Sequence, residues 1–516
     1  MSIASFSKPK RLLLLPRVLA SCGLMSARLP AFAFAMLMPC LASVCSAQKE
    51  PPPEPLREFR GAWVATVRGI DFPFEPGDPT PKQQAEIVLI CEKAAALKLN
   101  ALIFQVRPAA DAVYKSSIEP WSPWLTNAMG KAPDPEWDPL QFFINEAHKR
   151  GIELHAWFNP FRALSGPKYK GAKNHVSLTH PEWCWQYGEN LWMDPGEPAV
   201  RARSLEVMLD VTRRYDIDGV HMDDYFYPYP IQEKGVTVPF PDGKAWKKYQ
   251  DSGGTLSRSD WRRDNVNTFV RDLYAGVKRE KPWVRVGISP FGLWRPGYPE
   301  GMGKGALDPY EALAADSLKW LQNGWCDYFA PQLYWPIEQK NLSFIGFFDW
   351  WLTQNTAQRH IWPGMASERV LKDRQPAEIL RQISHTRNRI QYMPPGHIHW
   401  NFTALKKNLG TLADLCGDRA YQDYALVPSA SWLGKDKPAA PALKVQDGKA
   451  EWQYADARMD THVRWWFVQT HDGKTWTALR LMPVEQKSIP VPKGAVGVAV
   501  RAISRSGMSG EAAVIW

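Results

Sequence analysis

Cysteine is scarce and unpaired in this chain of 516 residues. Three of the seven cysteines lie within the first 47 residues, and the other four are isolated from one another: Cys91, Cys184, Cys326 and Cys416. There is no CxxC pair and no histidine at the spacing of a second metal ligand, which argues against zinc. We therefore predict a functional site with no metal and no cofactor.

Long apolar runs and dense basic blocks are also missing. After Ala47, no apolar stretch approaches the length of a membrane-spanning helix. The net charge is +10, but residues 1–47 hold five basic residues and no acid. The rest of the chain therefore carries only about half of this excess, and it is spread diffusely. The sequence therefore predicts no nucleic-acid partner. A mild positive surface suits an anionic polymer better.

The first 47 residues have the pattern of an export signal. An apolar stretch at residues 29–44 precedes Cys45-Ser46-Ala47, whose small residues suit cleavage after Ala47. Lipid attachment is the alternative, because residues 19–22 resemble a lipobox. We expect an exported protein of the periplasm or cell envelope, peripheral to the membrane, with a proline-rich tether at residues 48–56.

Strand-forming segments alternate with helical patterns from residue 57 to about residue 404, as in parallel βα units. The expected strands are residues 59–67, 101–106, 153–158, 219–223, 284–289, 328–334, 361–365 and 398–402. Seven helical patterns lie between them, which predicts an α/β fold, a (β/α)8 TIM barrel, over residues 57–434. A doubly wound open sheet is the alternative, but the glycine-rich phosphate loop typical of such sheets is absent.

The chain changes character near residue 435. A linker at residues 438–441 precedes short alternating segments at residues 450–454, 463–470, 475–479, 488–491 and 496–504. This pattern predicts a fibronectin type III-like β-sandwich over residues 435–516. Because these strands carry no cluster of catalytic residue types, we expect an accessory or spacer domain.

The most informative segment is Asp-Gly-Val-His-Met-Asp-Asp-Tyr at residues 218–225. It places Asp223 and Asp224 where the fourth expected strand ends, and barrel enzymes carry their chemistry at this end. Adjacent carboxylates repel, which separates an acid from a base. We predict that this pair is catalytic. The alternatives are a loop cap or a cation site, and a second carboxylate supplied by Asp111 or Glu368.

Tryptophan is abundant, with 25 residues in the chain. Its flat apolar face can stack on a sugar ring, although large cores also use aromatic residues. Together with polar residues at strand ends, these aromatics predict a sugar-binding cleft. The expected substrate-binding residues are Trp63, Arg107, Trp157, Asn159, Tyr225, Gln332, Tyr334 and Trp335. Burial in the barrel core is the alternative for each of them.

Six motifs, in order, resemble the bacterial glycosyl-hydrolase-like 10 family. They are REFRGAWV at residues 57–64, FQVRP at 104–108, AWFNP at 156–160, DGVHMDDY at 218–225, ISPFG at 288–292 and APQLYW at 330–335. The resemblance implies a (β/α)8 glycosidase, often exported to the cell envelope and often carrying an appended β-sandwich. It also implies peptidoglycan glycan strands as substrate, especially strands without stem peptides.

An adjacent aspartate pair is also similar to that of N-acetylhexosaminidases that use substrate assistance. In those enzymes one Asp orients the 2-acetamido group of the substrate, and the other protonates the leaving oxygen. We therefore expect a glycoside hydrolase acting on a cell-wall polysaccharide. The alternatives are a hydrolase of another polysaccharide and a non-hydrolytic carbohydrate-binding barrel, which would not need both carboxylates.

Overall fold

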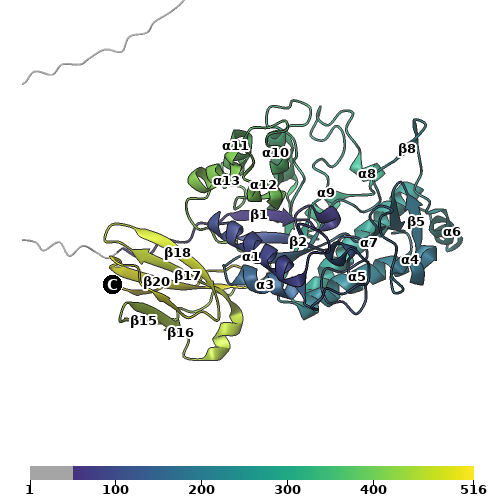
Figure 1. Cartoon of the computed structure of the whole chain (residues 1–516). Helices are drawn as coiled ribbons and strands as arrows, with labels where there is room; N and C mark the ends of the chain where they lie inside the picture. Colours follow the sequence, from purple (N-terminus) through teal and green to yellow (C-terminus); the bar gives the residue numbers. More distant parts are fainter. Residues whose placement is uncertain (1–49) are drawn as a thin grey trace, which may run out of the picture. The chain divides into compact units, whose positions relative to one another are not determined.

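The computed structural model describes residues 50–516 (Figure 1). The expected export signal, the lipobox and the first residues of the tether lie outside this range. Residues Pro51–Trp516 form one compact unit. Over the described part of the chain, no helix is both long enough and apolar enough to cross a bilayer.

Nine strand segments form one parallel sheet that closes on itself. Their spatial order is β12 (His360–Ile361), β11 (Tyr328–Phe329), β10 (Arg285–Ile288), β7 (Gly219–Met222), β3 (Glu153–Phe158), β2 (Ala101–Arg107), β1 (Phe59–Val64), β14 (Gly396–Trp400) and β13 (Gly364–Ala366). β12 and β13 are two pieces of one strand interrupted at Trp362-Pro363, where proline lacks the N–H of a ladder bond. The two edges of the sheet therefore meet in the same segment, and the predicted α/β barrel of the TIM type is confirmed.

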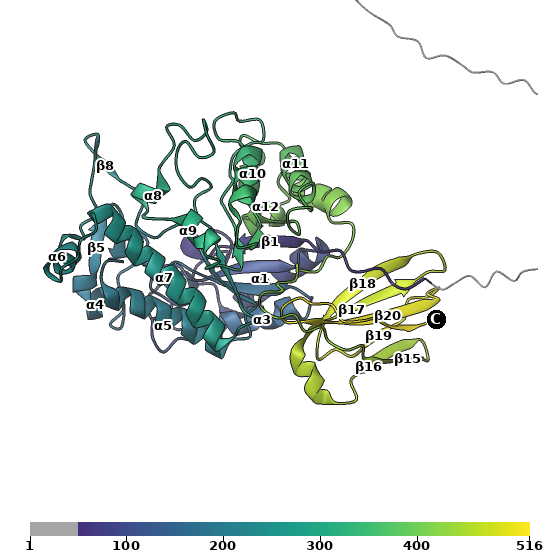
Figure 2. The ribbon, with the colours of Figure 1, turned by 180° about the vertical axis from the view of Figure 1, so that it is seen from behind.

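Helices follow the strands and surround the barrel (Figure 2). They are α1 (Thr80–Ala96), α3 (Pro139–His148), α5 (Pro198–Arg214), α7 (Arg258–Glu280), α9 (Ser317–Gln322), α10 (Phe344–Gln354) and α11 (Pro376–Arg387), with α12 (Phe402–Lys406) and α13 (Leu412–Leu415) after β14. Their starts follow local sequence signals. Asp138 caps α3 by accepting from the Gln141 backbone N–H, and Pro139 occupies the first turn.

Two insertions extend the loops at the carboxyl end of the barrel. After β3, a small antiparallel sheet has the order β4 (Arg162–Leu164), β6 (Asn190–Met193) and β5 (Cys184–Tyr187), with α4 (Val176–Thr179) beside it in sequence. After β7, β8 (Gln232–Glu233) and β9 (Val236–Thr237) form a hairpin that projects from the barrel, followed by α6 (Gly243–Asp251) (Figure 1). Short helices α2 (Pro123–Thr126) and α8 (Pro309–Ala312) lie in other loops.

Two small antiparallel sheets form the C-terminal region. One has the order β15 (Ala442–Gln446), β16 (Lys449–Gln453) and β19 (Ser488–Pro490); the other has β18 (Trp476–Pro483), β17 (Val463–His471), β20 (Gly497–Ser504) and β21 (Ala513–Ile515). Trp452 from the first sheet and Trp466 and Val500 from the second share a buried cluster. The structure contains the five strands expected here and adds β15 and β21. β15 alternates Leu443 and Val445 with Lys444 and Gln446, a short pattern that the sequence prediction did not include.

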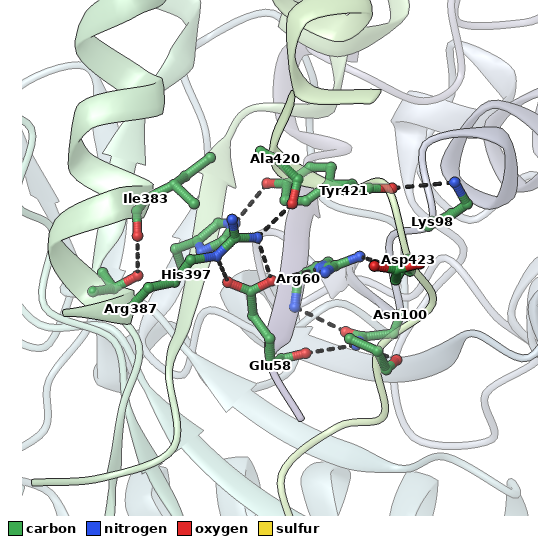
Figure 3. Close-up of polar contacts among 12 residues, drawn as sticks. Glu58, Arg60, Lys98, Asn100, Ile383, Arg387, His397, Ala420, Tyr421 and Asp423 are labelled. Atoms are coloured by element: carbon green, nitrogen blue, oxygen red, sulfur yellow. Dashed lines mark hydrogen bonds and ion pairs between the residues drawn. The ribbon is translucent and has the colours of Figure 1, made fainter. Parts of the chain in front are cut away.

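A buried ion-pair network closes the amino end of the barrel (Figure 3). Glu58, which is 1% exposed, accepts from Arg60 Nε at 2.7 Å and from Arg387 Nε at 2.7 Å. Arg60 Nη1 also donates to the Asp423 carbonyl at 2.7 Å. The network therefore ties β1 to α11 and to the segment that leaves the barrel.

The C-terminal sheets pack against this amino end. Leu426 shares an apolar cluster with Trp465, Phe467, Leu481 and Ile503. The Arg464 guanidinium lies 2.7 Å from Asp218, just before β7. The opposite, carboxyl end of the barrel therefore remains available for a site.

Candidate active site

Asp223 and Asp224 follow β7 directly and lie in a cleft of about 240 Å³ at the carboxyl end of the barrel. The cleft receives side chains from the ends of several strands and the loops after them. They are Trp63, Trp157, Asp223, Asp224, Tyr225, Tyr229, Ser289, Gln332, Tyr334 and Trp400. The structure thus brings together seven of the ten residues predicted for catalysis and binding.

Asp223 is held by N–H donors on both oxygens. Trp157 Nε1 donates to Oδ2 at 3.1 Å, and Asn159 Nδ2 lies 3.3 Å from each oxygen. The backbone N–H of Tyr225 donates to Oδ1 at 3.4 Å. Because every one of these groups only donates, the arrangement stabilises an ionised carboxylate.

Asp224 has a different set of partners. The hydroxyl of Tyr229 hydrogen-bonds to Oδ2, and Gln332 makes a second side-chain hydrogen bond. Gln332 is itself positioned by donating to the Ser289 carbonyl at 3.1 Å. A hydroxyl can donate or accept, so Tyr229 can accompany Asp224 in either protonation state.

Burial is the main influence on the protonation of the pair. Asp223 is 5% exposed and Asp224 is 4% exposed. Burial, together with the neighbouring charge of Asp224, raises the pKa of Asp223 to about 7. Burial also raises the pKa of Asp224, while its bond from Tyr229 opposes the rise. Two interacting carboxyls titrate as a pair, so the pair retains one proton close to neutral pH.

Trp63 forms the end of a hydrogen-bonded chain that runs through the barrel interior. Its indole N–H donates to His221 Nε2 at 3.1 Å, and His221 Nδ1 lies 2.9 Å from the Tyr328 hydroxyl. That hydroxyl lies 2.8 Å from His155 Nδ1. Burial keeps the pKa of His221 well below its usual range. Since an indole only donates, neutral His221 carries its proton on Nδ1, and Tyr328 donates onward to His155.

Trp400 joins the aromatic walls of the cleft. Its ring centre lies 6.0 Å from Trp63 and 6.0 Å from Trp157, in edge-to-face geometry. It also stacks with Tyr334 at 6.5 Å. The cleft therefore combines two carboxyls with several aromatic faces, the composition expected of a sugar subsite.

Arg107 and Trp335 do not line this cleft, contrary to the sequence prediction. Arg107 is fully buried and forms a bidentate pair with Glu119 at 2.6 and 2.8 Å. Its remaining nitrogen donates to the Asn159 carbonyl at 2.6 Å. Trp335 packs against Phe291 and another phenylalanine. Arg107 therefore supports the loop after β3 from behind.

Asn159 has a supporting place as well. It is buried, donates to Asp223, and accepts from the Arg162 backbone N–H at 2.9 Å. Both ends of the Asn159 amide are hydrogen-bonded within the protein, and Asn159 does not line the cleft. It therefore positions Asp223 and makes no direct contact with a sugar in the cleft.

The alternative second carboxylates, Asp111 and Glu368, are not among the residues that line the cleft. Asp111 is fully buried and accepts from the Ala109 backbone N–H at 2.8 Å; burial raises its pKa to about 7. Glu368 follows β13, and burial raises its pKa. Across residues 50–516, no three His, Cys, Asp or Glu side chains gather as a metal site would require.

Four residues near the pair were not predicted: Tyr229, Ser289, Trp400 and Arg162. Tyr229 belongs to the aromatic run after the pair, and Ser289 to the ISPFG motif, so both carried a local signal. Trp400 lies within the last expected strand. The guanidinium of Arg162 lies 4.4 Å from the ring centre of Tyr225, and its charge lowers the pKa of both aspartates against the effect of burial.

Comparison with known proteins identifies the family of this chain. Residues 58–377 match the family described as glycosyl hydrolase-like 10. The chain is 37% identical over 406 residues to glycosyl hydrolase YngK of Bacillus subtilis (strain 168), covering 76% of this chain and 78% of that protein. It is 34% identical over 313 residues to glycosyl hydrolase DigH of Escherichia coli (strain K12), covering 57% of this chain and 69% of that protein.

Among solved structures, the PgaB (BpsB) glycoside hydrolase domain from Bordetella bronchiseptica aligns with a TM-score of 0.44 and 13% identity, covering 70% of this chain and 99% of that domain. The family match spans more than half of the chain and agrees with the six sequence motifs. The chain is therefore a glycoside hydrolase and belongs to the glycosyl hydrolase-like 10 family.

Proposed function

We propose that this glycoside hydrolase cleaves the glycan strands of peptidoglycan and prefers strands that have lost their stem peptides. The observation that carries the proposal is the adjacent pair Asp223 and Asp224, buried in one aromatic-walled cleft. Within the described chain, no other carboxylate lines that cleft. Peptidoglycan sugars carry 2-acetamido groups. Two neighbouring acids with no third carboxylate can use such a group as the nucleophile.

The pair favours acetamide assistance over two independent carboxylates. A conventional nucleophile or base lies across the sugar ring from the acid, at a separation of about 5–9.5 Å. Two consecutive residues at one strand end lie on the same side of the sugar, so they suit a mechanism in which the substrate supplies the nucleophile. The acetamide oxygen attacks the anomeric carbon as the glycosidic bond breaks, and the departing oxygen takes a proton from the acid. Water then opens the cyclic intermediate and returns the proton to that residue.

We assign the two roles from the hydrogen bonds of each carboxyl group. Asp223 accepts only from N–H groups, so it is the carboxylate that receives and orients the acetamide N–H. Burial favours the proton on Asp223 in the free protein. A substrate acetamide N–H that donates to Asp223 lowers its pKa and leaves the shared proton to Asp224, which we therefore assign as the general acid. Tyr229 can accept from protonated Asp224 as well as donate to its carboxylate. Trp63, Trp157 and Trp400 offer the ring faces for stacking.

Digestion of purified peptidoglycan tests this function. Intact sacculi and amidase-treated sacculi are incubated with the protein, and the released fragments are identified by mass. The proposal expects sugar fragments from the amidase-treated sample and few from the intact one. Equal release from chitin or a plant polysaccharide would favour hydrolysis of another glycan.

We also propose that residues 435–516 form a fibronectin type III-like accessory domain beside the barrel domain of residues 57–434. The arrangement of three and four antiparallel strands around a shared core supports this assignment. A chain ending at Gly434 should hydrolyse short oligosaccharides, because every cleft residue precedes that point. It should also melt at a lower temperature, because Leu426 loses the apolar partners supplied by β17, β18 and β20.

We also propose that the protein is exported to the periplasm or cell envelope. The substrate lies there, and residues 1–47 have the pattern of a signal. N-terminal sequencing of the mature protein separates cleavage after Ala47 from lipid attachment at Cys22.

A further inference from the structure

A second hollow lies in the insertion after β3, on the same end of the barrel as the active-site cleft. Its volume is about 440 Å³, which exceeds the roughly 240 Å³ of the cleft itself. Leu164, Leu178 and Leu191 provide apolar walls, and Tyr169 and Lys170 lie on the same rim. Leu178 is 58% exposed, which leaves an apolar surface facing solvent.

The hollow is connected to the cleft by the ribbon of β4 and β6. Arg162 pairs with Trp192 across this ribbon, and Leu164 pairs with Leu191. The Arg162 guanidinium lies over the ring of Tyr225, a cleft residue, and Leu164 lines the hollow. Two residues of extended strand span about 7 Å, so the hollow begins a short distance along the ribbon from the cleft wall.

Lysines outnumber acids around this hollow. Residues 164–178 contain three lysines and no acid, and Lys170 lines the hollow together with one acid, Glu189, from the turn between β5 and β6. Within the described chain, Lys170 and Lys173 form no ion pair, while Lys168 lies 4.8 Å from the ring centre of Tyr169. A further hollow of about 320 Å³ contains Asp308 and Glu311 together with Arg262. Three lysines against the single acid Glu189 leave a local positive excess, which attracts an anionic chain that continues from the cleft along the β4–β6 ribbon.

The cleft accommodates little more than one sugar ring, whereas a polymer continues beyond it. Strands without stem peptides expose a carboxylate on every second sugar. We propose that the hollow of Leu164, Leu178 and Lys170 is a distal subsite that binds a carboxylate-bearing sugar of the strand held in the cleft. The inference rests on the proposed function and adds the basis on which an anionic strand is selected over a neutral one.

Affinity and hydrolysis are measured separately to test the subsite. Binding of a long denuded strand and of a neutral chitin oligomer is measured by calorimetry in the Asp224→Asn background, so that neither ligand is consumed. Lys170→Glu reverses the charge of the one lysine that lines the hollow, and Leu178→Asn removes an apolar wall. Lys474→Glu, at an exposed turn of the C-terminal sheets, is the control with the same charge change.

The subsite predicts a loss of about threefold to tenfold in affinity for the denuded strand with Lys170→Glu, since exposed ion pairs are individually weak. That loss should shrink at high salt. Chitin binding should be unchanged by Lys170→Glu and weakened by Leu178→Asn. Hydrolysis of a short substrate that fills only the cleft should be unchanged by Lys170→Glu and Leu178→Asn.

Equal affinity of Lys170→Glu and Lys474→Glu for the denuded strand would overturn the subsite while leaving the proposed hydrolysis intact. Conversely, if the native protein cleaves no denuded strand but Lys170→Glu still lowers binding, the proposed hydrolysis fails and the subsite stands.

Discussion

The indole N–H of Trp157 donates to Oδ2 of Asp223 across 3.1 Å. The two residues are 66 positions apart in sequence, yet β3 and β7 are paired neighbours in the barrel. Both side chains are almost fully buried. The contact fixes the first aspartate of the pair against the aromatic wall of the cleft, where the proposed mechanism requires an acetamide group to be oriented.

Asp224→Asn should stabilise the protein at alkaline pH. Aspartate titrates near 3.9 in an unfolded chain, whereas burial raises the pKa of both members of the pair, that of Asp223 to about 7. Ionising the pair therefore costs stability as pH rises from about 4 to about 7. The variant should gain about 1–3 kcal/mol in unfolding free energy near pH 8 and nothing near pH 4. Thermal melts at both pH values provide the measurement, and a gain independent of pH would contradict this view.

Tyr229→Phe should shift the pH profile of turnover. The Tyr229 hydroxyl lowers the pKa of Asp224, so its removal raises that pKa and moves the alkaline limb of the profile to higher pH. Turnover at the optimum should fall about tenfold, because the lost bond involves a charged partner. Tyr227→Phe is the control, since the buried Tyr227 hydroxyl has no partner in the described structure. Identical profiles for the two variants would argue against a role for Tyr229.

Arg464→Met should destabilise the protein without changing the cleft. Arg464 is buried, lies 2.7 Å from Asp218 and 3.0 Å from Asp216, and holds the pKa of Asp218 below its usual range although burial alone would raise it. Removing one partner of a buried pair costs about 3–5 kcal/mol. Arg505→Met, which breaks a more exposed pair with Asp216, should cost about 1 kcal/mol or less. Denaturant unfolding distinguishes them, and equal losses would contradict the ranking.

The two aspartates should respond differently to the leaving group. Asp224→Asn should lose most rate on substrates with poor leaving groups and little on aryl glycosides of acidic phenols, which need no protonation. Asp223→Asn should lose a similar factor on both, because acetamide orientation is needed for either. Rate constants across a series of aryl N-acetylglucosaminides provide the test. The reverse pattern would exchange the two roles.

The sequence was sufficient to predict the strands of the barrel, because each apolar run is bounded by turns and followed by a helical pattern. Strand ends were less predictable. The strand expected at residues 328–334 ends at Phe329, two residues before Pro331, and the one expected at residues 361–365 is interrupted at Pro363. Strand neighbours and register, such as that of β3 with β7, depend on barrel closure, which a single sequence does not encode locally.

The site could be predicted in part for the same reason. Asp223, Asp224 and Trp63 follow directly from strand ends, where side chains converge. Arg107 occupies an equivalent position, but its buried partner Glu119 lies in an irregular loop that no periodic pattern identifies. Trp400 enters the cleft from the last strand, which only closure brings beside Trp63.

The most direct test of this account is the turnover of Asp223→Asn and Asp224→Asn on amidase-treated peptidoglycan strands, beside the native protein. General acid–base and positioning roles predict that each variant loses at least about a hundredfold while remaining folded. Fragment release at near-native rates by both variants would show that the pair is not catalytic.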